Sequence, residues 1–419
     1  MSTPRSAAGG APGAATPGRS PDVIVVGAGI VGACAALELA RGGASVEVLE
    51  RGGGWGEGCS WGNAGLLVPS HARPIAAPES LKAGLGWMVK SDSPFGLKLK
   101  PSLAPWLARY LRASTSSRAA EGEALQRELC REGLGAFREL AAEGIDGGYD
   151  EPGCLTVHTS ADAEEHAAAE AASETGRTLG ARVLTGAEAR ELEPALTSAV
   201  RAAVLFPHEG RCDPVRLAAA VGAAAEARGV RLRTGVEAYG VRSEGVDTTR
   251  GPQRAGKIVV AAGAWSGGLA RSAGVRLPLQ GGKGYAAEWD PAAAPARMPL
   301  YLHDQRVVAN PMADRTRLTG GLLLDGLDES FDQRRVRAIA RAAEEVLGVR
   351  AQPRLAWRGL RPCTPDGLPV IGESRGVVFA TGHGMLGVTL GPLTGRLVAS
   401  IVRGDASHPA LARLTPERF

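Results

Sequence analysis

The chain has 419 residues, enough for two ordinary domains with a large buried core. Its hydrophobic content of 44%, charged content of 22% and formal net charge of +4 are ordinary for a globular protein, and they give no reason to expect nucleic acid as a partner. The six cysteines form no C-x-x-C pair, so we expect reduced thiols, as in a cytosolic protein, and no metal site.

Residues 1–20 are mostly Ala, Gly, Pro and Ser and have almost nothing to bury, so we predict a disordered tail. The segment lacks the apolar stretch of a secretory signal. No apolar run in the chain approaches the roughly 20 residues that a membrane helix needs. We therefore expect a cytoplasmic protein without a transmembrane segment, and peripheral contact with the inner face of the membrane stays open.

Residues 21–50 predict a unit that binds a dinucleotide. A β-branched strand at 23–26 is followed by G-x-G-x-x-G, then by a helix at 33–41 and a second strand at 45–49. Gly27 permits the tight turn, Gly29 lets the backbone approach a pyrophosphate, and Gly32 lets helix and strand pack closely. The carboxylate of Glu50 is placed to accept hydrogen bonds from a ribose, which argues against NADP. The fingerprint does not separate FAD from NAD.

A long glycine-rich loop, GGGWGEGCSWGNAG, then replaces the early return to helix and strand that a plain NAD domain shows. Gly58–Ser60 offers backbone N–H groups and a hydroxyl that suit a second phosphate. Asn63, Ala64 and Gly65 supply small residues and an amide that can lie against a flat ring. The alternative interpretation is a flexible surface loop.

The middle of the chain predicts helices and then strands. Residues 120–195 are rich in Ala, Glu and Arg and read as amphipathic helices interrupted by a strand near 153–159. Asp213 is placed to cap a helix that has Pro214 at its first position. Residues 229–241 alternate like a strand, and the strand at Ile258–Ala261 leads into a small-residue turn. Residues 275–330 predict an antiparallel sheet.

Residues 358–372, RGLRPCTPDGLPVIG, predict a rigid connection rather than a helix or a strand. Three prolines fix φ angles, and Asp366-Gly367 is a turn pair. Rigidity is useful if Arg361 must point in one direction, because a guanidinium binds a carboxylate through two parallel hydrogen bonds. The alternative is an ion pair between Arg361 and a structural Asp or Glu.

These motifs together resemble the D-amino-acid dehydrogenases, which belong to the wider family of FAD-dependent D-amino-acid, glycine and sarcosine oxidases. The resemblance extends from Asp22 to Gly404 and includes FPHEGRCDP at 206–214, KGY at 283–285 and TGHGMLGVT at 381–389. It implies an α/β fold in which a Rossmann-like FAD-binding domain is interleaved with an α+β substrate domain that carries an antiparallel sheet. We expect the FAD-binding domain at 21–80, 212–274 and 355–404, the substrate domain at 81–211 and 275–354, and a C-terminal tail at 405–419.

The resemblance also implies roles for individual residues. Arg361 is expected to bind the substrate α-carboxylate, helped by Tyr285. A helix that begins near Leu390 is expected to direct its positive end at the flavin, and His383 is not expected to act as a base. FAD contacts are expected from Gly27, Ala28, Gly29, Ile30, Val31, Gly32, Glu50, Arg51, Cys59, Ser60, Asn63, Ala64, Gly65, Ala238, Ala262, Gly263, Gly359, Gly382, His383, Gly384, Met385, Leu386, Gly387 and Thr389.

The implied reaction belongs to amino-acid catabolism. A D-amino acid transfers a hydride from Cα to flavin N5, the imine is hydrolysed to a 2-oxo acid and ammonia, and the electrons pass to a quinone or an electron-transfer protein. One alternative is a glycine or sarcosine type of amine oxidase that uses O₂. Others are a flavin-carrying subunit of a larger dehydrogenase complex and, more weakly, an NAD-dependent dehydrogenase. The substrate side chain stays open.

Overall fold

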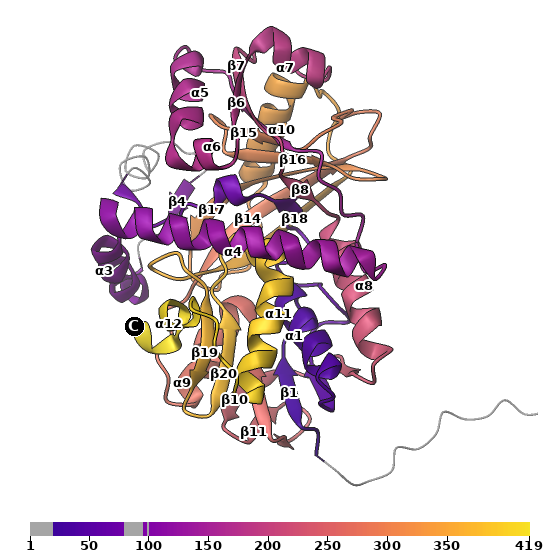
Figure 1. The fold of residues 1–419 in the computed structure, drawn as a ribbon, viewed down its shortest axis with the longest axis vertical. Helices are drawn as coiled ribbons and strands as arrows, with labels where there is room; N and C mark the ends of the chain where they lie inside the picture. The colour runs from indigo at the N-terminus through magenta and orange to yellow at the C-terminus, as the bar shows by residue number, and fades with distance from the viewer. Residues whose placement is uncertain (1–19, 79–94, 99) are drawn as a thin grey trace, which may run out of the picture.

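The computed structural model describes residues 20–78, 95–98 and 100–419, so the predicted tail at 1–20 lies outside the described residues except for Ser20. Figure 1 shows two parts: one contains β1, α1 and α11, and the other contains β15, α5 and α10. The long helix α4 (Ser116–Ala142) crosses the front of the molecule where the two parts meet.

The first part is built on a six-stranded sheet. Its order is β19 (Val370–Ser374), β20 (Val377–Thr381), β13 (Lys257–Val260), β1 (Val23–Val26), β2 (Val46–Leu49) and β9 (Arg231–Arg233). β1 pairs in parallel with β13 and β2, and only β19 pairs antiparallel. This is the doubly wound arrangement that the fingerprint predicts.

Both faces of this sheet are covered, which explains its continuous apolar strands. Val23 and Val25 pack with α1 (Ile30–Arg41), α8 (Pro214–Glu226) and α11 (Gly387–Arg403). Ile24 and Val26 face α9 (Ser266–Ser272) and a small sheet on the other side. That small sheet comprises β10 (Ala238–Arg242), β11 (Gly245–Thr248) and β12 (Gln253–Arg254).

The second part contains a nine-stranded mixed sheet. Its order is β18 (Leu355–Cys363), β14 (Gln280–Trp289), β17 (Thr316–Leu324), β16 (Val307–Pro311), β15 (Leu300–Leu302), β5 (Cys154–His158), β7 (Ala202–Phe206) and β6 (Arg182–Thr185), with β4 (Phe95–Leu97) beside β17. The strands from β14 to β17 pair antiparallel with one another, as predicted for residues 275–330. The fold therefore agrees with the expected mixed α/β class.

Helix α10 (Gln333–Leu347) covers one face of this sheet. Val336, Ile339, Ala343 and Val346 recur every three or four residues and are buried in the same core as β14 and β17. The remaining elements are η1 (Pro69–His71), η2 (Pro101–Leu103), η3 (Gly263–Trp265), η4 (Pro416–Arg418), α3 (Ala104–Ala113), α5 (Ala163–Ala172), α6 (Glu174–Thr178), α7 (Gly186–Leu192), α12 (Leu411–Leu414) and the two-stranded pair β3 (Leu66–Leu67) and β8 (Gly210–Arg211).

Two local predictions are confirmed. The Asp213 side chain accepts hydrogen bonds from the N–H groups of Val215 and Arg216, with Pro214 at the first helical position, so it caps α8. All six cysteines are free thiols.

The structure corrects several expected boundaries. Residues 355–363 were expected in the FAD-binding domain, but β18 pairs along its whole length with β14 and belongs to the nine-stranded sheet. The prediction that residues 358–372 form no strand is also wrong, because β18 extends to Cys363 and β19 begins at Val370. Residues 405–419, expected as a tail, contain α12 and η4, and Arg418 donates to the Asp366 carboxylate. The expected single strand at 229–241 is two strands, β9 and β10, which lie in different sheets. The last helix, α11, begins at Gly387 rather than near Leu390.

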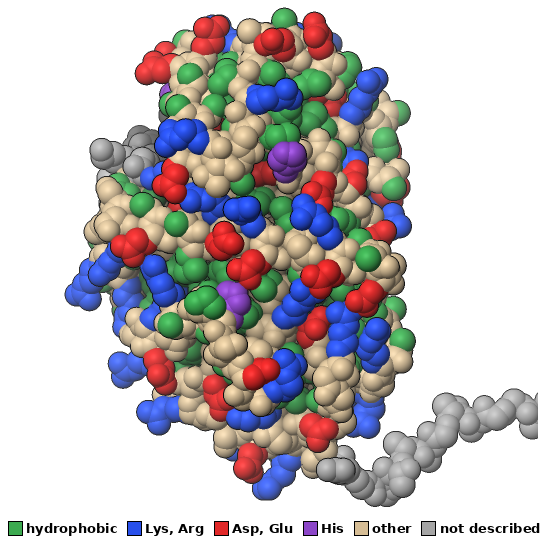
Figure 2. Space-filling model, in the orientation of Figure 1, with side chains coloured by type: hydrophobic (Ala, Val, Ile, Leu, Met, Phe, Trp, Pro, Cys, Tyr) green, Lys and Arg blue, Asp and Glu red, His purple; other side chains and the backbone are tan. Residues whose placement is uncertain are grey.

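The described helices include none with both the length and the apolar character to cross a membrane. Figure 2 shows Lys and Arg side chains interspersed with Asp and Glu over the visible face rather than gathered into one basic area.

Candidate active site

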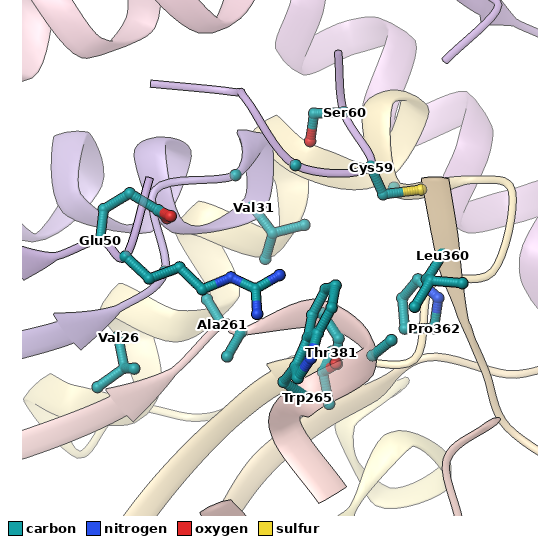
Figure 3. Close-up of a pocket in the computed structure, with 18 of the residues that line it drawn as sticks. Val26, Val31, Glu50, Cys59, Ser60, Ala261, Trp265, Leu360, Pro362 and Thr381 are labelled. Carbon is teal, nitrogen blue, oxygen red and sulfur yellow. The ribbon is translucent and has the colours of Figure 1, made fainter. Parts of the chain in front are cut away.

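A cavity of about 350 Å³ lies at the carboxyl end of β1, where the glycine turn, the loop after Glu50 and the last glycine-rich segment meet. In Figure 3, Glu50 lies at one end, Val31 and Trp265 lie along it, and Cys59 and Pro362 lie at the other. An elongated cavity with a carboxylate at one end suits an extended dinucleotide.

The glycine turn has the geometry that a pyrophosphate site requires. Gly27 has φ +105°, a conformation that residues with a Cβ rarely adopt. A Cβ on Gly32 would lie 1.9 Å from Gly27 O, so only glycine allows α1 to pack this closely. Helix α1 begins without a side-chain cap and without an acidic residue in its first turn. Its positive end is therefore open to phosphate charge.

Glu50 holds the turn from the end of β2. Its two carboxylate oxygens accept hydrogen bonds from Ala28 N and Gly52 N, each at 2.7 Å. Next to it, the Arg51 guanidinium lies over the Trp265 ring, 3.7 Å from its centroid, and both residues line the cavity. This end of the cavity thus combines a carboxylate with a flat aromatic and cationic surface.

The loop after Glu50 is fixed rather than free. Ser60 Oγ accepts a hydrogen bond from Ile30 N at 3.0 Å, which ties the loop to the start of α1. Arg317 on β17 donates to Trp61 O at 2.6 Å and to Asn63 O at 2.9 Å. The predicted alternative of a flexible surface loop therefore does not hold for residues 58–65.

Arg317 itself is held by a buried ion-pair network. It is fully buried and bonds the Glu288 carboxylate at 2.6 Å. Arg315 bonds the same carboxylate and also Asp213, the cap of α8. The network links the substrate sheet, the cavity loop and α8 through charges that compensate each other.

The last glycine-rich segment, residues 382–387, forms another wall of the cavity. His383, Gly384 and Gly387 line it. His383 is buried, its Nε2 lies 3.0 Å from Thr394 Oγ1, and burial lowers its pKa to about 4. The ring is therefore neutral at physiological pH and takes part in packing and hydrogen bonding, in line with the expectation that it is not a base.

The cavity includes most, but not all, of the expected FAD contacts. Those that line it are Gly27, Gly29, Ile30, Val31, Glu50, Arg51, Cys59, Ser60, Asn63, Ala238, Ala262, Gly263, His383, Gly384 and Gly387. Those that do not are Ala28, Gly32, Ala64, Gly65, Gly359, Gly382, Met385, Leu386 and Thr389. Thr389 needs a clear correction, because its hydroxyl donates to Leu66 O and is not available to a ring.

Sequence reasoning missed several lining residues. Val236, Glu237 and Tyr239 come from the segment around β10. Trp265 comes from η3, Leu327 from the turn after β17, and Leu360 from β18. Val236, Glu237 and Tyr239 are next to the predicted contact Ala238 in the sequence, so that prediction already indicated their segment. Leu327 lies in the substrate part and carries no motif of its own, whereas Leu360 lies between the predicted site residues Gly359 and Arg361.

Arg361 lies near the Cys59 end of the cavity without lining it. It is half-buried, and a Cβ on Gly284 of β14 would lie 2.4 Å from its guanidinium carbon. Its Nη1 donates to Gly321 O at 2.5 Å. Burial raises the pKa of the Cys59 thiol, while the nearby charge of Arg361 lowers it. Within the described ranges, no carboxylate forms an ion pair with Arg361, so the alternative of a structural ion pair fails.

Tyr285 lies on the opposite face of the same sheet. Side chains alternate along a strand, and Tyr285 is in register with Arg358, three residues before Arg361. The ring is 2% exposed and is buried in the core that includes Val336 and Ile339 of α10. The expectation that Tyr285 helps Arg361 to hold a carboxylate is therefore wrong.

These residues fit FAD. The turn at Gly27 and the open start of α1 suit the pyrophosphate, and Glu50 suits a ribose. The end of the cavity opposite Glu50, at Cys59 and Pro362, is left for the flavin ring. The small residues at Ala262 and Gly263 give the backbone access that a bound dinucleotide needs.

Comparison with known proteins agrees with this site. Residues 22–401 match the family described as FAD dependent oxidoreductase, abbreviated DAO. The chain is 33% identical to a D-amino acid dehydrogenase of Paramagnetospirillum magneticum, over 95% of this chain and 98% of that protein. It is 30% identical to a D-amino-acid oxidase of Bradyrhizobium diazoefficiens, over 95% and 98% of the two chains.

Solved structures show the same architecture. A glycine oxidase from Geobacillus kaustophilus is 27% identical, with a TM-score of 0.72 over 95% of this chain and 99% of that chain. An L-proline dehydrogenase from P. horikoshii, at 19% identity, shares the fold with a TM-score of 0.73 over 96% and 98% of the two chains. The chain therefore belongs to the DAO family of FAD-dependent oxidoreductases, and FAD is its cofactor.

Proposed function

We propose that this enzyme oxidises D-amino acids to 2-oxo acids and ammonia, and that Arg361 binds the substrate carboxylate. The observation that carries the proposal is the state of Arg361. The buried Arg315 and Arg317 are each paired with a carboxylate, whereas Arg361 has only the Gly321 carbonyl as a partner within the described part of the chain. A half-buried cation without a counter-ion is suited to an anionic ligand.

The choice of a D-amino acid rests on the relatives. Several proteins named D-amino acid dehydrogenase are 30–33% identical over almost the whole chain. The glycine oxidases and the L-proline dehydrogenase share the fold. All of these names describe amino-acid substrates, which carry the carboxylate that Arg361 would bind.

In this mechanism the protein contributes mainly position. Bound FAD supplies the acceptor for the hydride that leaves Cα of the substrate. Arg361 fixes the carboxylate and, with it, the direction of the Cα–H bond. Such alignment lowers the activation barrier by several kcal/mol. The amine must be neutral so that its lone pair can form the C=N bond, and water then releases the 2-oxo acid and ammonia. His383 does not remove a proton, because its ring is buried and bonded to Thr394.

We propose a quinone or an electron-transfer protein as the electron acceptor. The oxidase among the relatives makes O₂ the second candidate. The test is anaerobic reduction of the FAD-loaded protein by D-alanine, D-proline, L-alanine, glycine and sarcosine, followed by reoxidation with air or with a soluble quinone. Bleaching of the flavin bands by a D-amino acid with fast recovery only in quinone supports the dehydrogenase. Fast recovery in air with peroxide selects the oxidase, and no bleaching by any amino acid refutes the proposal.

The role of Arg361 has its own test and a matched control. Arg361→Met should lower kcat/KM by about 100-fold or more, mainly through KM, because a charge-paired partner contributes about 3 kcal/mol. Arg358→Met removes an arginine of the same strand that points to the other face and bonds Glu329. It should leave kcat/KM within a few-fold of the wild type. Equal effects of the two substitutions would remove Arg361 from the substrate site.

A further inference from the structure

A cluster of imidazole and carboxylate groups lies outside the cavity, in the other part of the molecule. β5 pairs in parallel with β15, Val157 opposite Leu302, and the His303 N–H donates to Val157 O at 3.0 Å. The next residues in this register are His158 and His303. Their rings consequently lie side by side, with centroids 4.5 Å apart.

Helix α5 brings two more ligand groups to the same place. His166 and Glu170 are four residues apart, so they lie on one side of the helix. Glu170 Oε2 lies 3.2 Å from His158 Nε2. One ligand atom each from His158, Glu170 and His303 lies within 4.8 Å of the others. The His166 ring is 6.3 Å and 6.1 Å from those of His158 and His303.

The cluster also contains a buried ring nitrogen without a partner in the described chain. His158 is fully buried, and its Nδ1 has no hydrogen-bond partner among the described residues. A ring nitrogen in that state can accept a ligand from outside the chain.

We propose that His158, Glu170 and His303, with His166 as the fourth ligand, bind one Zn²⁺. Imidazole nitrogens with one carboxylate form a ligand set that zinc prefers, whereas Mg²⁺ and Ca²⁺ prefer oxygen. Tetrahedral zinc with bonds of about 2.0–2.1 Å places neighbouring ligand atoms about 3.3 Å apart. The ligand atoms of His158, Glu170 and His303 lie within 4.8 Å of one another, so they would move closer together around the ion. His166 is exposed and can turn to complete the shell from the solvent side.

The site would act on structure and not on flavin chemistry. It joins α5 to β5 and β15, and Figure 1 shows α5 and β15 far from β1 and α1 at the FAD cavity. Four protein ligands leave no open position for a substrate, as in structural zinc sites. Zinc should therefore stabilise the fold and leave the flavin spectrum unchanged.

The experiment uses the FAD-loaded full chain without a histidine tag, stripped with a chelator and dialysed. Equilibrium dialysis against ZnCl₂, with zinc measured by mass spectrometry, should give one zinc per chain, and zinc should raise the unfolding temperature. MgCl₂ should do neither. Co²⁺ should give the intense visible absorption of a tetrahedral site, to the red of the flavin bands.

Variants locate the ion. His166→Gln, at an exposed position that cannot affect folding much, should weaken zinc binding at least tenfold, and His303→Gln should abolish the stoichiometric site. His408→Gln is the control, because His408 bonds Glu132 at a separate place. An intact flavin spectrum shows that each variant is folded. Zinc retained equally by all three variants, or less than one zinc per wild-type chain at saturation, overturns the proposal.

Discussion

Replacing Arg317 by Met tests whether the buried network fixes the cavity loop at residues 58–65. Arg317 provides two hydrogen bonds to the loop, to Trp61 O and Asn63 O. Its Glu288 partner keeps the bond from Arg315 at 3.1 Å after the substitution. The change therefore removes the anchor of the loop without leaving a carboxylate entirely uncompensated.

The expected loss follows from these contacts. Each hydrogen bond from a charged group contributes about 1.5–3 kcal/mol, so the unfolding free energy should fall by about 3 kcal/mol. Breaking a buried ion pair completely costs about 3–5 kcal/mol, and the remaining Arg315 keeps the loss at the lower end. FAD binding must then order a loosened loop, and ordering the backbone of one residue costs about 1–2 kcal/mol of conformational entropy. We expect the FAD dissociation constant to rise about 30-fold, equivalent to ~2 kcal/mol.

The assay combines urea unfolding with titration of the apoprotein by FAD. Arg315→Met is the matched control, because Arg315 bonds the same Glu288 and also Asp213 but does not touch the loop. This control should lose a similar amount of stability and keep its FAD affinity within about twofold. If both variants lose FAD affinity equally, or if neither does, the loop is not held by Arg317 and the reasoning fails.

Three other substitutions test the remaining parts. Glu50→Gln removes the charge of the ribose-side carboxylate and should weaken FAD binding about tenfold in the same titration, since a charged bond exceeds a neutral one by ~1.4 kcal/mol. Gly32→Val places a Cβ 1.9 Å from Gly27 O and should abolish flavin retention on purification, whereas Gly135→Ala, with nothing within 4 Å, should not. Burial raises the pKa of Glu209 from 4.5 to about 8, so the folded state holds a proton that the unfolded chain releases. Stability should therefore fall as pH rises through this range, and urea unfolding of Glu209→Gln should lack that decline.

The sequence was most informative where function depends on local backbone geometry. Gly27 and Gly32 were assigned from spacing alone, and the structure shows a positive φ at the first and a close approach at the second. The Asp213 cap is another local feature, since the capped N–H groups lie two and three residues away. Such features depend only on residues that are neighbours in the sequence, so a short motif is enough to predict them.

Contacts between distant segments were less predictable. Tyr285 and Arg361 were both assigned from short motifs. The face of the sheet on which each side chain lies depends on the register between β14 and β18, which the motifs do not contain. Thr389 was expected at the flavin, yet its hydroxyl bonds Leu66, more than three hundred positions earlier. The histidine cluster was missed for the same reason. Cysteine spacing gave no metal signal, and the pairing of β5 with β15 is what joins His158 to His303.

The buried charges of the substrate sheet separate into two kinds. Arg315 and Arg317 form ion pairs with Glu288 and Asp213, and these pairs offset the desolvation of the buried guanidinium groups. The two arginines therefore fix the position of the segments that they connect. Arg361 lacks such a partner in the described chain, so the folded protein retains a partly desolvated positive charge near the flavin end of the cavity. A substrate carboxylate would supply the missing compensation. In the proposed reaction, this compensation would favour binding of the substrate and hold it in one orientation.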